Sequence, residues 1–292
     1  MNIKNILVIS DQKDKSQKAL AHAKNLAKRY DASLHVVGFS YENLAILTES
    51  LSETQIEQAK ERILQDHKVC LEGAIAQQKL PNNTTCEIVW SKDIARWVKQ
   101  HCADRFDLII KTGHRSERAF YVPTDWHLLR NGVSPIMLVA EKKWRKKQSI
   151  MVSLDMASKV KSKQALNQKL IEAGKMLATA NDMPLHLCFS LAISPVLKDL
   201  GIIDKNKTVK QAKAKYMPLM QAMLGDYELP PEHIHIKAGD TKKVIPSVAS
   251  EIGAALVVIG SVGRKGLKAK LLGNTAESVL VLLKTDVLIV QP

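Results

Sequence analysis

The sequence lacks the features that mark several common classes of protein. Aromatic residues make up only 4% of the 292 residues, and the four cysteines contain no C-x-x-C pair. A disulfide-rich secreted domain and a cysteine-based metal site are therefore not expected, and the thiols should be reduced. No leading segment joins positive charge to a long apolar run, and no apolar run has the length of a membrane span. We therefore expect a cytoplasmic protein without a membrane-spanning helix.

Two familiar nucleotide-binding motifs are absent as well. No Gly-Lys-Ser/Thr triplet stands at a predicted helix start, and Gly260 and Gly263 are too far apart for the G-x-G-x-x-G pattern. The sequence therefore argues against a P-loop NTPase and against a Rossmann-type dehydrogenase.

Positive charge is abundant. The 43 Lys and Arg residues against 29 Asp and Glu give a formal net charge of +14, which favours anionic partners such as nucleic acid, anionic lipid or phosphorylated ligands. The most basic run, residues 205–215, has no interleaved aromatic residues and is typical of a solvated helix face. Nucleic acid is therefore not the expected partner. A basic surface that binds nucleic acid or an anionic lipid-like metabolite remains the alternative hypothesis.

Short apolar segments alternate with helical patterns along the first half of the chain. Apolar runs at 6–9, 33–37, 86–90, 107–110 and 136–139 predict strands, and helical spacing occurs at 13–30, 42–78, 94–103 and 125–130. Residues 52–54 are the plausible helix start within the second of these helical segments. Such alternation favours a doubly wound parallel sheet with helices on both faces.

The second half of the chain repeats the first. Residues 17–37 align with residues 168–188 at a constant offset of 151, and the strand at 6–11 corresponds to residues 150–155. We therefore predict two tandem domains, at residues 1–141 and 149–292, joined by a short charged linker at 142–148.

The stretch from Ala254 to Ser278 carries the strongest functional pattern. An apolar run at 254–259 predicts a buried strand, glycines follow it, and a helical pattern begins near residues 273–275. Glycine lets a ligand approach the backbone, and the first turn of a helix offers unpaired N–H groups to an anion. This order predicts a phosphate-binding site. The alternative is that the glycines only form a turn and that Asn274 or Thr275 caps the helix.

The spacing of these residues resembles a known signature. Gly260, Gly263, Gly273 and Asn274 match G-x2-G-x9-G followed by a small polar residue, which is the nucleotide-binding pattern of the universal stress protein family. The first copy carries Pro-Thr-Asp-Trp-His-Leu-Leu-Arg at 123–130, as in tandem members of the E type. The resemblance implies an α/β fold of two five-stranded parallel sheets, each with strand order 3-2-1-4-5. It also implies that the copies close on each other as an internal pseudo-dimer, and it leaves a homodimer of chains open.

The resemblance further implies a site for ATP or a related adenine nucleotide, with or without Mg²⁺, in the second copy. In such sheets, ligands lie beyond the carboxyl ends of the strands where the winding reverses. Asp155 would accept hydrogen bonds from base or ribose, or alternatively cap the following turn or helix. The backbone of Leu187 would contact adenine, unless the residue only fills the core. The ribose and phosphates would meet Gly260, Gly263, Gly273, Asn274 and Thr275.

The first copy has lost this pattern, and no catalytic group accompanies it in the second. Thr112, Arg115 and Val122 stand opposite the three glycines, and Pro123 removes an N–H donor at the helix start, so the first copy is not expected to bind ATP in the same way. No paired base and nucleophile lies beside the glycine loop. We therefore expect a stress-response protein that acts through ligand-dependent interactions, with at most slow, metal-dependent ATP hydrolysis.

Two groups of residues that include histidine could suggest a catalytic cluster or a metal site. Asp125, Trp126 and His127 would lie on different faces of one helix, so they are not expected to form a catalytic cluster. His233 and His235 would share one face of a predicted strand. Because no third ligand is evident nearby, a metal site is not expected there.

Overall fold

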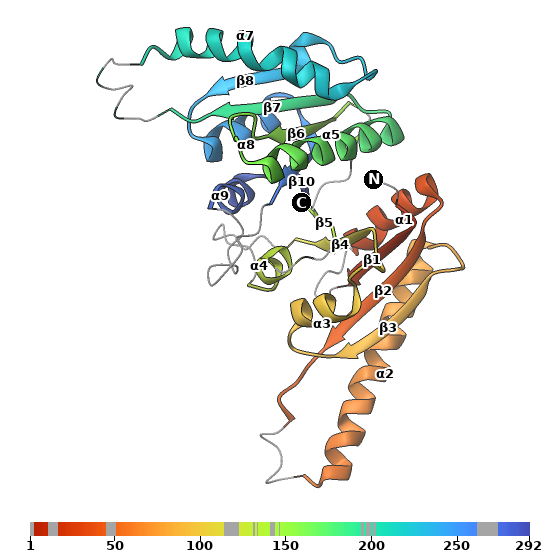
Figure 1. The fold of residues 1–292 in the computed structure, drawn as a ribbon. Helices are drawn as coiled ribbons and strands as arrows, with labels where there is room; N and C mark the ends of the chain where they lie inside the picture. Colours follow the sequence, from red (N-terminus) through yellow and green to blue (C-terminus); the bar gives the residue numbers. More distant parts are fainter. Residues whose placement is uncertain are drawn as a thin grey trace. The chain divides into compact units, whose positions relative to one another are not determined.

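The described residues form two compact units. The computed structural model describes residues 3–10, 17–44, 51–113, 123–130, 132, 134–140, 144–145, 147–193, 196, 200, 203–261 and 274–292. One unit contains the described residues up to Val139, and the other begins at Ala140 (Figure 1). Within these described ranges, every helix is too short or too polar to cross a bilayer.

The first unit alternates strands and helices as predicted. Its elements are β1 (Asn5–Ser10), α1 (Lys18–Tyr30), β2 (Ser33–Ser40), α2 (Glu53–Gln78), β3 (Thr85–Trp90), α3 (Ile94–His101), β4 (Leu108–Thr112), α4 (Pro123–Arg130) and β5 (Ile136–Val139). The strands pair in parallel in the order β3-β2-β1-β4-β5. The predicted order 3-2-1-4-5 is therefore confirmed.

The second unit repeats this topology. Its elements are β6 (Ser149–Leu154), α5 (Lys161–Asn181), β7 (Leu185–Leu191), α7 (Lys205–Leu224), the 3₁₀ turn η2 (Pro231–His233), β8 (Ile234–Ala238), α8 (Thr241–Glu251), β9 (Ala254–Gly260), α9 (Asn274–Leu282) and β10 (Asp286–Val290). The parallel order is β8-β7-β6-β9-β10, which is again 3-2-1-4-5 in the unit's own sequence.

Helices cover both faces of each sheet, and this explains the apolar central strands. In the second unit, α5 contacts α7 and α8 contacts α9, so each pair covers one face. Leu256, Val257 and Val258 in β9 are fully buried although they point alternately to opposite faces. Each such side chain contributes about 1.5–3 kcal/mol through burial. The same arrangement leaves the carboxyl ends of the strands at one edge, where loops lead into the helices.

Helix α2 begins at Glu53 because Ser52 caps it. The Ser52 Oγ accepts a hydrogen bond from the Gln55 backbone N–H at 3.3 Å, and the Gln55 Oε1 accepts one from the Ser52 N–H at 2.9 Å. This reciprocal pair satisfies two N–H groups that the helix itself cannot pair. The predicted start at 52–54 is confirmed, whereas the helical spacing from residue 42 does not extend the helix.

Candidate functional site

A cavity lies at the carboxyl ends of β6, β7 and β9 in the second unit. Its volume is about 320 Å³, and its lining includes Asp155 after β6, Phe189 and Ser190 of β7, and Gly260 and Ser261 at the end of β9. Strands β6 and β9 are neighbours, and the chain leaves them in opposite directions across the sheet. The cavity therefore occupies the position at which doubly wound folds hold ligands.

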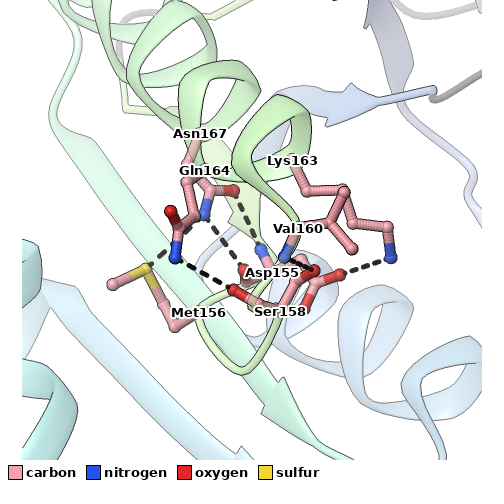
Figure 2. A network of polar contacts seen from close by, with 7 residues as sticks. All are labelled: Asp155, Met156, Ser158, Val160, Lys163, Gln164 and Asn167. Atoms are coloured by element: carbon pink, nitrogen blue, oxygen red, sulfur yellow. Dashed lines mark hydrogen bonds and ion pairs between the residues drawn. The ribbon is translucent and has the colours of Figure 1, made fainter.

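The backbone of Asp155 is fixed by one buried side chain. The Asp155 N–H donates to Asn167 Oδ1 at 3.0 Å, and Asn167 Nδ2 donates to the Asp155 carbonyl at 3.0 Å (Figure 2). Asn167 belongs to α5 and is only 4% exposed, so both ends of its amide are satisfied away from bulk water. This double contact holds the strand end at a fixed distance from helix α5.

The carboxylate of Asp155 forms an ion pair with Lys163 in the first turn of α5. Lys163 Nζ lies 2.9 Å from Asp155 Oδ2, with side chains 37% and 49% exposed (Figure 2). An ion pair this exposed contributes about 0–1 kcal/mol, so a ligand can displace either partner at little cost. Val160 precedes the helix, and no side chain caps it there. Asp155 therefore does not cap α5.

Gly260 permits close packing between β9 and α5. A Cβ on this residue would lie 2.7 Å from Leu166 Cδ2 and 3.2 Å from Leu170 Cδ1, so both leucine side chains would have to shift. Leu166 and Leu170 also line the cavity. The glycine therefore favours close helix packing at the cavity wall, in addition to any approach of a ligand to its backbone.

The equivalent place in the first unit is built differently. Thr112 pairs with Val139 as Gly260 pairs with Val290, so the two positions correspond. Thr112 Oγ1 accepts a hydrogen bond from the N–H of Ala19, which stands opposite Leu170 in the repeat. The smaller alanine leaves room for the threonine side chain between strand and helix.

A buried ion pair adjoins Thr112. Lys111 Nζ lies 2.8 Å from Asp125 Oδ1, with side chains 4% and 0% exposed, and it also donates to the Thr112 carbonyl at 3.0 Å. Asp125 is the acidic residue of the Pro-Thr-Asp-Trp-His segment and stands opposite Ala276, which lines the cavity in the second unit. The first unit thus joins β4 to α4 with charge, where the second has the uncharged residues Ile259 and Ala276.

Comparison with known proteins places both halves of the chain in one family. Residues 2–140 and 148–291 each match the Universal stress protein family. The chain belongs to the universal stress protein family. It is 29% identical to Universal stress protein E of Salmonella typhi over 99% of this chain and 94% of that protein. It is also 28% identical to a Universal stress protein E homolog of Haemophilus influenzae, over 100% of this chain and 98% of that protein.

Solved universal stress protein structures share the tandem fold. A putative member from Pseudomonas aeruginosa UCBPP-PA14 superimposes with a TM-score of 0.70 at 24% identity, over 99% of this chain and 94% of that one. A member from Archaeoglobus fulgidus DSM 4304 gives 0.66 at 17% identity, over 100% and 99%. At identities of 24% and 17%, the similarity to these structures shows that the fold is shared.

The structure brings together some of the residues that the universal stress protein signature predicts. Asp155 and Gly260 both line the cavity, whereas Leu187 lies in the middle of β7, fully buried and paired with Val152 and Ile234. The cavity is lined instead by Phe189 and Ser190, which lie two and three positions farther along β7. Gly263 and Gly273 lie outside the described residues. Asn274 and Thr275 begin α9, and their side chains are outside the description.

Sequence reasoning missed several residues of this universal stress protein's site. Lys163 and Asn167 follow Asp155 by eight and twelve positions, and Thr241 enters the lining from the first turn of α8. In the first unit, Lys111 could have been noticed from the sequence, because it is the one charged residue of strand β4. Asp125, Trp126 and His127 are respectively buried, half-buried and exposed, so they lie on different faces as predicted.

Proposed function

We propose that this universal stress protein binds ATP or a related adenine nucleotide in its second domain and acts through interactions that depend on the bound ligand. The observation that supports this most is the coincidence of two features. The cavity lies where the winding of the sheet reverses, with Asp155 and Gly260 at the ends of neighbouring strands. It occurs in the copy that carries the G-x2-G-x9-G-Asn spacing.

The size and chemistry of the cavity suit the nucleoside part of such a ligand. A volume of about 320 Å³ lies at the lower end of the range for small-molecule sites. Leu154, Phe189 and Val279 supply apolar walls for a base, and Asp155 offers acceptors for its amino group or for ribose hydroxyls. Phosphates would extend toward the start of α9, where the helix presents unpaired N–H groups.

The lining favours binding over chemistry. Asp155 and Lys163 are the titratable side chains among the described lining residues, and they pair with each other. No base and nucleophile are juxtaposed among them, so we expect any ATP hydrolysis to be slow and to need Mg²⁺. Lys163 becomes available to an anionic ligand once Asp155 turns to the ribose or the base.

Calorimetric titration of ATP with Mg²⁺ tests the proposal. The unmodified chain, checked beforehand for bound nucleotide, should bind one equivalent, and Gly273→Val should abolish the heat because a branched side chain blocks the backbone approach. Val122→Ile, at the opposite position of the first copy, is the matched control and should leave binding unchanged.

Absence of ATP binding would contradict the proposal. If ATP gives no heat and no protection against unfolding, and is absent from the purified chain, the nucleotide proposal fails. A steep salt dependence of binding to nucleic acid or to anionic lipid vesicles would then support the alternative based on the basic surface.

A further inference from the structure

Three histidines meet at the edge of the second unit, away from the cavity. His186 lies in β7, His235 in the edge strand β8, and His233 in the turn η2 just before it. The His186 and His233 ring centroids are 4.0 Å apart, and those of His186 and His235 are 5.2 Å apart. The pairing of β7 with β8 thus adds a third imidazole to the two that the sequence places on one strand face.

Two nitrogens of this cluster are already at the separation of neighbouring metal ligands. His186 Nδ1 and His235 Nε2 are 3.0 Å apart and share one hydrogen bond. Two imidazole nitrogens, each about 2.0–2.1 Å from a metal ion and adjacent in its coordination sphere, lie about 2.9–3.4 Å apart. A metal ion bound to both nitrogens would lie off the line that joins them, so each ring must rotate by roughly 40° to direct its lone pair at the ion.

We propose that His186 and His235 chelate a divalent transition-metal ion of the kind that prefers imidazole, such as Ni²⁺, Cu²⁺ or Zn²⁺. In the described part of the chain, no three His, Cys, Asp or Glu side chains are arranged around one metal position. The chelate therefore has two protein nitrogens, and water completes the coordination. His233, partly exposed beside the pair, is the side chain placed to approach as a further ligand.

The surroundings of the cluster set its electrostatics. Burial, together with the imidazoles of His233 and His235, lowers the pKa of His186 to about 4. The pKa of His235 is lowered by burial, and Glu251 opposes this effect. Lys237 also faces His235 but lies 3.7 Å from Glu251, which offsets part of its charge. The local charge therefore permits binding but keeps the affinity modest.

The first unit contains the same histidine without the partners. His35 stands opposite His186 in the repeat, and its Nδ1 contacts Thr85 Oγ1 while its Nε2 lies 3.1 Å from Glu87 Oε1. Thr85 and Glu87 occupy the places that His233 and His235 take in the second unit. One copy thus pairs its histidine with a hydroxyl and a carboxylate, and the other surrounds it with imidazoles. His35 in the first unit therefore serves as an internal control for metal binding at His186.

Titration of the full chain with Ni²⁺, after removal of metals with a chelator, tests the proposal. Calorimetry should show one site, and His186→Gln and His235→Gln should each weaken it at least about tenfold, as loss of metal-site groups generally does. Paramagnetic Ni²⁺ should broaden the imidazole NMR signals of His186, His233 and His235 and leave those of His35 sharp. His35→Gln is the matched control and should leave the affinity unchanged.

Other outcomes overturn the inference. An affinity that survives in the His186→Gln/His235→Gln double variant, or that His35→Gln reduces, would place Ni²⁺ elsewhere. If a single variant unfolds, the NMR broadening in the unmodified chain decides the question by itself, since absence of selective broadening at His186 and His235 rejects the chelate. None of these results depends on whether the second unit binds a nucleotide.

Discussion

One glycine and its counterpart show how single residues distinguish the two halves of this universal stress protein. Gly260 leaves space for Leu166 and Leu170, whereas Thr112 fills the same place against Ala19 and accepts its N–H. The sequence signature predicts Gly260 as a ligand contact, and the packing against α5 is visible only in the folded structure. Side chains such as Lys163 and Asn167 were not predictable, because the rotation of α5 decides which of its residues faces Asp155.

We predict that Gly260→Thr destabilises the second unit. The added atoms would overlap Leu166, and overpacking of this kind costs about 1–3 kcal/mol of unfolding free energy. The measurement is urea denaturation followed by circular dichroism. Gly73→Ala in α2 is the control, since a Cβ there meets nothing within 4 Å and should stabilise the chain by about 0.5–1 kcal/mol. Equal stability of Gly260→Thr and the unmodified chain would contradict the packing argument.

Whole elements were more predictable than the contacts between them. The buried strands are short apolar runs, and Ser52 and Gln55 mark the start of α2, so periodicity and capping located these elements. The ion pair of Lys111 with Asp125 joins β4 to α4, and the cluster of His186 with His235 depends on the pairing of β7 with β8. Both need the strand and helix positions of the folded chain, which local sequence patterns do not contain.

The link between β4 and α4 leads to the second prediction. Lys111→Met should destabilise the first unit by about 3–5 kcal/mol, because it removes a cation that lies 2.8 Å from the fully buried Asp125 carboxylate. The double variant Lys111→Met/Asp125→Leu should recover most of this loss, since apolar residues can replace a buried pair. Denaturant unfolding of both single variants and the double variant measures the coupling. Additive losses would show that the pair does not join the two elements.

Across the whole molecule, duplication has kept the fold and changed the chemistry at matching places. Both units have the strand order 3-2-1-4-5, yet their strand ends and edge histidines have different partners. The four thiols also differ in environment: Cys70 is exposed, Cys86 is intermediate, and Cys102 and Cys188 are buried. The repeat in the sequence could predict the shared fold, but the burial of each thiol required the packed structure.

The different burial of these thiols predicts different reactivities. Burial raises the pKa of Cys188 to about 12 and that of Cys102 to about 11, so at pH 8 neither forms appreciable reactive thiolate. In the native chain, an excess of a disulfide reagent at pH 8 should therefore react first with Cys70, and Cys70→Ser should remove the fast phase. All four thiols should react in denaturant. A fast phase that persists in Cys70→Ser would mean that another thiol is accessible.

The missing Cβ at Gly260 has a mechanical consequence. With no side chain between them, the end of β9 and the leucines of α5 are in direct contact, and Asn167 fastens the end of β6 to the same helix. Both strand ends are therefore coupled to the same helix. Helix α5 has 21 residues and is about 30 Å long. A ligand that separates the strand ends would therefore act on the amino-terminal half of α5, while the carboxyl-terminal end of this helix lies near the start of β7, at the opposite edge of the sheet.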